Sequence, residues 1–186
     1  MSKAVLISIR PKWVEKIAND KKTIEVRKTR PKLETPFKCY IYCTRDKHLV
    51  FMQNQTGTNL IACMDVDAAI PVGGAIGNGK VIGEFTCDRI YEIAPLNHAQ
   101  DDVEKQACLT REEIVNYLKG TGYGWHISDL RIYDTPKELS EFKTLCRVDA
   151  DCCACPYYNY TKMDCDGRVI GRPPQSWCYV ETLYIL

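Results

Sequence analysis

A short segment near the N-terminus, residues 21–28, alternates apolar and polar side chains. If this segment is a strand, its period of two places the apolar side chains on one face and Thr23, Glu25 and Arg27 on the other. The apolar side chains must be buried against a core, so the segment predicts a sheet with one buried face. The polar row is either a functional surface or the solvated side of an ordinary antiparallel strand, and the pattern alone favours the second interpretation.

Strands outnumber helices in the pattern of the remaining chain. Apolar runs rich in β-branched and aromatic residues predict strands over residues 4–9, 37–43, 80–93, 123–133 and 175–185. Helical spacing and capping residues predict helices over residues 11–19, within 97–120, and from 135 onward. Strands interrupted by short helices are typical of an α+β domain on an antiparallel sheet, and we expect this sheet to curl into a small barrel.

The charges of the chain are unevenly distributed. The formal net charge is only +1, yet residues 1–48 hold thirteen Lys and Arg against five Asp and Glu, whereas residues 49–186 hold twelve against nineteen. A basic segment of this kind is expected where a protein meets an anion such as phosphate. A chain of 186 residues is long enough for a sizeable core, and we treat residues 1–186 as a single domain.

The sequence predicts a soluble, cytoplasmic protein without membrane contact. Its N-terminal apolar run is too short for a signal peptide, and no 18-residue apolar stretch occurs in it. Eleven cysteines are many for a compartment in which thiols stay reduced. Five of them are expected to be small buried side chains, namely Cys39, Cys43, Cys63, Cys87 and Cys108.

Residues 146–172 form a Cys-rich stretch with few aliphatic side chains, which we interpret as a small insertion in the domain. The predicted ligands of a structural zinc ion are Cys146, Cys152, Cys155 and Cys165. Cys152 and Cys155 have the spacing of a zinc knuckle, although Cys153 is an alternative to Cys152. Such a loop buries little apolar surface by itself, so a metal would supply its folding energy. The competing interpretations are free thiols or a disulfide.

Two N-terminal segments carry a resemblance to a known family. Residues 7–13, Ile-Ser-Ile-Arg-Pro-Lys-Trp, and residues 20–27, Asp-Lys-Lys-Thr-Ile-Glu-Val-Arg, resemble the N-terminal signature of ASCH domains. Asp20 stands where that family usually has Gly. Residues 79–87 and 125–127 are similar to later strands of the family, and the chain as a whole resembles phage-associated members with an inserted Cys-rich stretch.

The resemblance implies an α+β fold, a PUA-like β-barrel with short helices, and a cleft that binds RNA or a nucleotide. It places Lys22, Glu25 and Arg27 in that cleft. Our own additions to the same surface are Arg10, Lys80, Trp125 and His126. Cations can donate to phosphates, a carboxylate can accept from an exocyclic amine, and an exposed ring can stack a base. Core packing is the alternative for Trp125, and a hydrogen-bonded structural role is the alternative for His126.

Some ASCH relatives look like amidohydrolases that act on acetylated cytidine with a Lys, a Thr nucleophile and a Glu. Lys22 matches their lysine, but Glu25 stands in the place of the nucleophile, and a carboxylate cannot replace that hydroxyl in the same mechanism. We therefore expect a binding module. The alternatives are a hydrolase such as a ribonuclease with Glu25 as general base, a protein-interaction module of a phage or its host, and a Glu25–Arg27 salt bridge that only stabilises the fold.

The zinc prediction is tested by metal analysis of protein purified without added zinc. We expect about one equivalent of zinc for a four-thiolate structural site, and a clear loss of it in Cys155→Ser. Cys108→Ser, a thiol outside the Cys-rich stretch, is the matched control and should retain the metal. Less than about half an equivalent in the wild-type protein would contradict the site.

Overall fold

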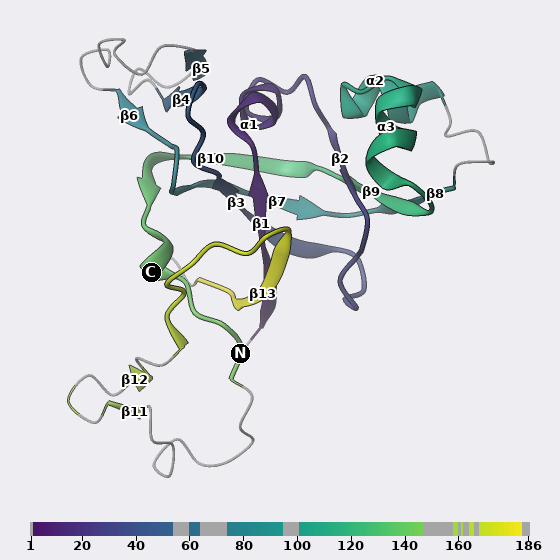
Figure 1. Ribbon diagram of the computed structural model, residues 1–186. Coiled ribbons are helices and arrows are strands. Elements are labelled where there is room, and N and C mark those ends of the chain that lie inside the picture. The colour runs from purple at the N-terminus through teal and green to yellow at the C-terminus, as the bar shows by residue number, and fades with distance from the viewer. Residues whose placement is uncertain are drawn as a thin grey trace.

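The computed structural model describes residues 2–53, 60–63, 74–94, 101–146, 158–159, 161, 164–165 and 168–183 (Figure 1). Its central feature is a five-stranded sheet in the order β10-β7-β3-β1-β13. These strands are β1 (Lys3–Ile9), β3 (Phe37–Cys43), β7 (Val81–Cys87), β10 (Ser128–Lys137) and β13 (Trp177–Glu181). β1 and β3 are parallel neighbours, and the other pairs in this sheet are antiparallel. The predicted strands over 4–9 and 37–43 are thus confirmed almost to the residue.

A second, antiparallel sheet carries the alternating segment. It consists of β2 (Ile24–Arg27), β9 (Gly122–His126) and β8 (Ile90–Ile93), with β9 in the middle. The single residue Ile127 separates β9 from β10, so the chain passes directly from this sheet to the edge of the central one. The predicted strands over 80–93 and 123–133 are each divided between the two sheets.

The expected closed barrel is wrong in the described part of the chain. The strands β10 and β13 lie at opposite edges of the central sheet and do not pair with each other, while β2, β9 and β8 hydrogen-bond in a separate sheet. The α+β class holds. Residues 44–72, for which the sequence pattern is uninformative, contribute β4 (Val50–Gln53) and β5 (Leu60–Cys63), which pair with each other beside β6 (Ala75–Ile76).

In the described residues three short α-helices connect the strands, and none of them is long and apolar enough to cross a bilayer. They are α1 (Pro11–Ala18), α2 (Asp101–Ala107) and α3 (Arg111–Leu118). Pro11 occupies the first turn of α1, where its missing N–H is not needed. Thr110 and Glu113 form the predicted capping box of α3, which divides the expected helical region into α2 and α3.

The helix expected from residue 135 is wrong, because β10 continues through Lys137. The turn that follows is a 3-10 helix over Leu139–Glu141, with Glu138 and Glu141 in a reciprocal capping arrangement. Farther along, β11 (Tyr158–Asn159) and β12 (Asp164–Cys165) pair as a short hairpin within the Cys-rich stretch.

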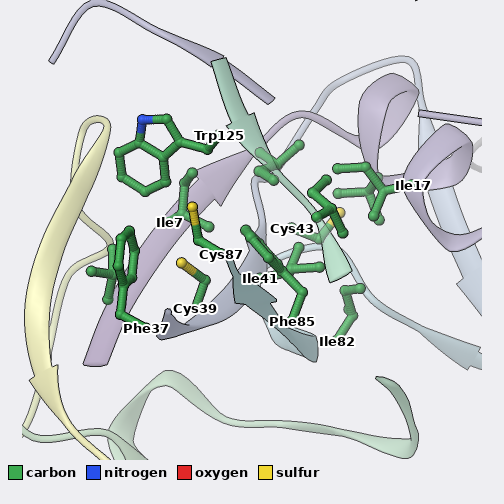
Figure 2. Packing of buried hydrophobic residues seen from close by; sticks show 14 of the residues in the cluster. Ile7, Ile17, Phe37, Cys39, Ile41, Cys43, Ile82, Phe85, Cys87 and Trp125 are labelled. Carbon is green, nitrogen blue, oxygen red and sulfur yellow. The ribbon is translucent and has the colours of Figure 1, made fainter. Parts of the chain in front are cut away.

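The main core lies on the face of the central sheet shown in Figure 2, where Ile7, Cys39, Phe85 and Trp125 are buried together. Cys39, Cys43 and Cys87 are buried as predicted, whereas Cys108 is only half-buried and the side chain of Cys63 lies outside the described residues. Burial raises the pKa of the Cys43 and Cys87 thiols to about 12, which keeps both protonated and unreactive at neutral pH.

The close approach of β7 and β10 at Gly83 gives a test of the sheet. A Cβ at this position would lie 2.5 Å from the Arg131 carbonyl oxygen, a backbone atom that cannot move without shifting β10. We expect Gly83→Ala to lower the free energy of unfolding by about 1–3 kcal/mol in urea denaturation. In Gly171→Ala, where no atom lies within 4 Å of the new methyl group, stability should be unchanged or slightly higher. Equal stability of the two variants would contradict the packing of β7 against β10.

Candidate functional site

All four residues of β2 are buried, so its polar row is not the solvated side of an ordinary strand. The apolar side chains Ile24 and Val26 pack with residues of α2 and α3, including Val103 and Leu118. On the other side, Glu25 and Arg27 are only 8% exposed, and Lys22 is 2% exposed. Burial of three charged side chains is expensive unless they are paired, which points to a specific arrangement.

Glu25 is the centre of this charged cluster, which consists of Lys22, Glu25 and Arg27. Its Oε1 lies 2.9 Å from Arg27 Nη2, and its Oε2 lies 3.4 Å from Lys22 Nζ. Both carboxylate oxygens are therefore occupied by cations. The charged cluster carries two positive charges and one negative charge.

The two cations also bind backbone and side-chain oxygens of distant elements. Lys22 Nζ donates to the Ala107 carbonyl at the end of α2 over 2.7 Å. Arg27 Nη2 donates to the Ser8 carbonyl in β1 over 2.6 Å, and Nη1 donates to Ser176 Oγ over 3.3 Å. These bonds fix the positions of both cations relative to β1, α2 and the start of β13. Arg27 Nε is buried without a hydrogen-bond partner among the described residues.

The charged cluster forms one wall of a cavity of about 580 Å³ between α1, α3 and β2. The lining residues are Ser8, Arg10, Trp13, Lys22, Glu25, Val26, Arg27, Thr44, Leu109, Tyr117 and Gln175. Three of these side chains are cationic and one is acidic. The lining therefore has an excess of positive charge, together with the rings of Trp13 and Tyr117.

Trp13 is surrounded by ammonium groups. The Nζ atoms of Lys12, Lys22 and Lys16 lie 4.7, 5.2 and 5.8 Å from the centre of its ring. Such cation–π contacts stabilise each ammonium group near the ring face. They concentrate positive charge at the α1 side of the cavity.

The structure brings together four of the seven residues that the sequence predicts for nucleic-acid binding. Arg10, Lys22, Glu25 and Arg27 line the cavity, while the other three lie elsewhere. Trp125 is fully buried in the main core, with its ring 5.9 Å from those of Phe37 and Trp177. This position matches the core alternative and leaves its ring faces inaccessible to a base.

Lys80 and His126 are outside the cavity and have other partners. Lys80 Nζ lies 2.9 Å from Glu138 in an exposed ion pair. His126 Nδ1 lies 2.6 Å from an Asp88 carboxylate oxygen. Burial raises the pKa of Asp88, but the hydrogen bond and charge of His126 outweigh it and hold this pKa below its usual value. His126 thus matches the alternative of a hydrogen-bonded side chain.

The strand begins at Ile24, three residues after the start of the alternating segment, and this changes which side chains meet. Because β2 starts at Ile24, Lys22 precedes the alternation and reaches the same side as Glu25. Thr23 Oγ1 instead donates to Gln106 Oε1 in α2 over 3.1 Å, and Thr23 does not line the cavity. The hydroxyl that is adjacent in sequence to Lys22 is therefore not beside Glu25.

Trp13 and Tyr117 are the aromatic cavity residues that sequence reasoning missed. Trp13 has the helical spacing of a core residue and is half-buried, and Tyr117 is 43% exposed on α3. One usable signal for Trp13 is the presence of Lys12 and Lys16 on the same helix, which surround the ring with charge. Nothing in the sequence indicates that Tyr117, 90 residues beyond Arg27, faces the same cavity.

The predicted zinc ligands are only partly described. Cys146 is exposed and Cys165 is buried, while Cys152, Cys153 and Cys155 lie outside the described residues. Among the residues that the structure does describe, no three His, Cys, Asp or Glu side chains are grouped as metal ligands. The zinc site therefore stays a prediction.

Comparison with solved structures finds the ASCH protein of Zymomonas mobilis. Its crystal structure is 18% identical to this chain and gives a TM-score of 0.56, over 96% of this chain and 87% of that one. A variant of the same protein, also 18% identical, gives a TM-score of 0.55 and covers 96% of this chain and 88% of its own. A second variant, 19% identical, gives a TM-score of 0.50 and covers 74% of this chain and 77% of its own. No family model and no curated protein matches the sequence. At this identity the likeness defines the fold alone.

Removal of Glu25 should destabilise the protein strongly, because it leaves two buried cations without their shared counter-charge. We expect Glu25→Ala to lower the free energy of unfolding by about 3–5 kcal/mol, measured by urea denaturation at neutral pH. The matched control is Glu138→Ala, which removes the partner of Lys80 from an exposed pair and should change stability by less than about 1 kcal/mol. A loss at Glu25 no larger than at Glu138 would show that the charged cluster is solvated.

Proposed function

We propose, from the premise that this chain has the fold of an ASCH domain, that it binds RNA or a nucleotide in the cavity beside Lys22, Glu25 and Arg27. The proposal rests on the charged cluster and not on the fold, since one fold supports many functions. The cavity is large enough for a nucleotide and combines a few fixed polar groups with apolar and aromatic walls, as ligand sites usually do.

The excess of buried positive charge is the observation that carries the proposal. Lys22 and Arg27 share one carboxylate, so the charged cluster keeps one positive charge without a paired anion. Arg10 adds an exposed cation at the same cavity. A phosphate group supplies the missing negative charge, and guanidinium and ammonium groups are its usual partners in proteins.

The remaining walls suit a nucleobase. Trp13 and Tyr117 offer ring surfaces on which any base can stack, a contribution of about 1–3 kcal/mol for each base. Glu25 has acceptor sites beyond the two that its cations use, because a carboxylate has about four lone-pair positions. It is therefore able to accept from an exocyclic amine while it holds Lys22 and Arg27 in place.

The contacts of Glu25 favour binding over hydrolysis. A general base needs a nucleophile within its hydrogen-bond reach, whereas the two ion pairs of Glu25 are with Lys22 and Arg27. Thr23, the nearest hydroxyl in sequence, is bonded to Gln106 away from the cavity. We therefore assign Glu25 the role of holding Lys22 and Arg27, and keep a hydrolase as the alternative that the same experiment tests.

The binding proposal is tested with labelled single-stranded RNA decamers and with the four nucleoside monophosphates. We expect Arg10→Gln and Lys22→Gln each to weaken binding about tenfold, because each removes a cation from the cavity. Arg10 is exposed, so its variant should keep the wild-type melting temperature even if that of Lys22 falls. Lys80→Gln removes an equal charge outside the cavity and is the matched control, with affinity expected to stay within about twofold.

The same samples separate the alternatives. RNA recovered intact after incubation supports a binding module, whereas cleavage that disappears in Glu25→Gln would favour the hydrolase. Equal effects of Arg10→Gln and Lys80→Gln would contradict the cavity as the site. No affinity for any of these probes would contradict nucleic-acid and nucleotide binding altogether, and would leave a protein-interaction module.

A further inference from the structure

The loop that follows β2 forms a second groove, of about 570 Å³, that the proposed nucleotide site does not use. Its lining residues are Lys28, Thr29, Arg30, Pro31, Lys32, Leu33 and Glu34, together with Tyr123 of β9. Three of these side chains are cationic and one is acidic. In Figure 1 this loop extends beyond the end of β2 before the chain enters β3.

The loop is held firmly although it has no regular secondary structure. Pro31 is buried, and Leu33 packs against the main core. Trp177 Nε1 donates to Thr29 Oγ1 over 3.0 Å, and the Lys32 backbone N–H donates to the Tyr179 hydroxyl over 2.7 Å. Every second side chain from Thr29 to Leu33 is thus held in place, and the backbone of Lys32 is bonded to β13 as well.

The cations occupy the positions between these anchors. Lys28, Arg30 and Lys32 are all exposed, at a regular spacing of two residues. None of the three has an ion-pair partner in the described part of the chain. A fixed loop that presents three unneutralised cations is preorganised for an extended anion, since little conformational freedom is lost when the anion binds.

The groove and the cavity share no lining residue, but neighbouring residues connect them. Arg27 lines the cavity, and the next residue, Lys28, lines the groove. Lys28 Nζ lies 5.5 Å from the ring centre of Tyr117, which is itself a cavity residue. Tyr117 therefore stands at the junction, in contact with both sites.

Aromatic groups accompany the cations along this path. The Arg30 guanidinium lies 5.8 Å from the ring centre of Tyr123, and Tyr117 is exposed beside Lys28. Cations beside aromatic rings and guanidinium planes are typical of single-stranded RNA sites, where phosphates bind the charges and unstacked bases stack on the planes. An acidic peptide would use the charges but not the rings.

We infer that the ligand is a single-stranded RNA segment whose backbone runs from the cavity past Tyr117 into the groove of Lys28, Arg30 and Lys32. One nucleotide occupies the cavity, and the phosphates of its neighbours contact the three cations. A base-paired duplex is excluded because its bases cannot enter the cavity without unpairing. The inference rests on the proposed function and adds that a chain of several nucleotides binds more tightly than one.

The test is a triple variant, Lys28→Gln, Arg30→Gln and Lys32→Gln, measured with a labelled single-stranded RNA decamer and with nucleoside monophosphates. Loss of three phosphate contacts should weaken decamer binding at least about tenfold at low salt and reduce the slope of log affinity against log salt by about 2. Monophosphate affinity should stay within about twofold of wild type, because the cavity is intact. Tyr123→Leu should weaken the decamer alone, by about five- to a hundredfold, through lost stacking.

A matched control removes the same charge elsewhere. This control is a triple variant that replaces three exposed lysines outside the cavity and the groove, namely Lys3→Gln, Lys47→Gln and Lys105→Gln. If the control weakens decamer binding as much as the groove variant, or if neither does, the path through the groove is wrong. Binding of polyglutamate as tight as that of the decamer would overturn the assignment to RNA.

These outcomes are distinct from failure of the cavity proposal. Monophosphates that bind in an Arg10-dependent manner, with a decamer that binds no more tightly than they do, would leave the nucleotide site intact and overturn only the path. Wild-type protein that binds neither probe would overturn both. Circular dichroism of the groove variant should match wild type, because all three substituted side chains are exposed.

Discussion

The Glu25 carboxylate, held between Lys22 and Arg27, is the interaction on which the candidate site depends. It neutralises part of a charge that could not otherwise be buried, and its two cations in turn reach the Ala107 and Ser8 carbonyls and the Ser176 hydroxyl. The charged cluster therefore joins β1, α2, β2 and the segment before β13. In most buried ion pairs the charges cancel, whereas here they do not. The remaining positive charge is the feature on which the proposed anion site rests.

Local sequence signals predicted much of the fold, and the errors concern how elements pair. Apolar runs located β1 and β3, and Thr110 with Glu113 located the start of α3, because these signals depend on neighbouring residues. The barrel was wrong because closure depends on which edge strands meet, and no local pattern encodes that. The predicted helix start at residue 135 failed for a similar reason, since pairing with β7 extends β10 through residues that would otherwise suit a helix.

The candidate site likewise combines residues that the sequence predicted with residues whose position depends on how distant elements pack. The resemblance to ASCH domains and the basic bias indicated Lys22, Glu25 and Arg27, but a strict strand period misplaced Thr23, because the strand starts only at Ile24. Trp125 and His126 are adjacent to one another and pair with Glu25 and Ile24 across the sheet, yet neither faces the cavity. Tyr117 does line the cavity, although it belongs to α3, far along the chain from β2. Strand register and helix packing determine which of these side chains face the cavity, and neither can be predicted from a local sequence pattern.

The parallel pairing of β1 and β3 has a consequence for how the protein can vary. Parallel neighbours cannot be joined by a tight turn, so the chain must leave the sheet and return, and here that crossover contains α1, β2 and the loop of Lys28, Arg30 and Lys32. The cationic part of the site is thus one continuous excursion between two adjacent strands. The exposed side chains of Lys28, Arg30 and Lys32 can change without altering the hydrogen bonds that hold the central sheet, whereas the buried charged cluster cannot. Ligand preference can therefore evolve at this loop separately from scaffold stability.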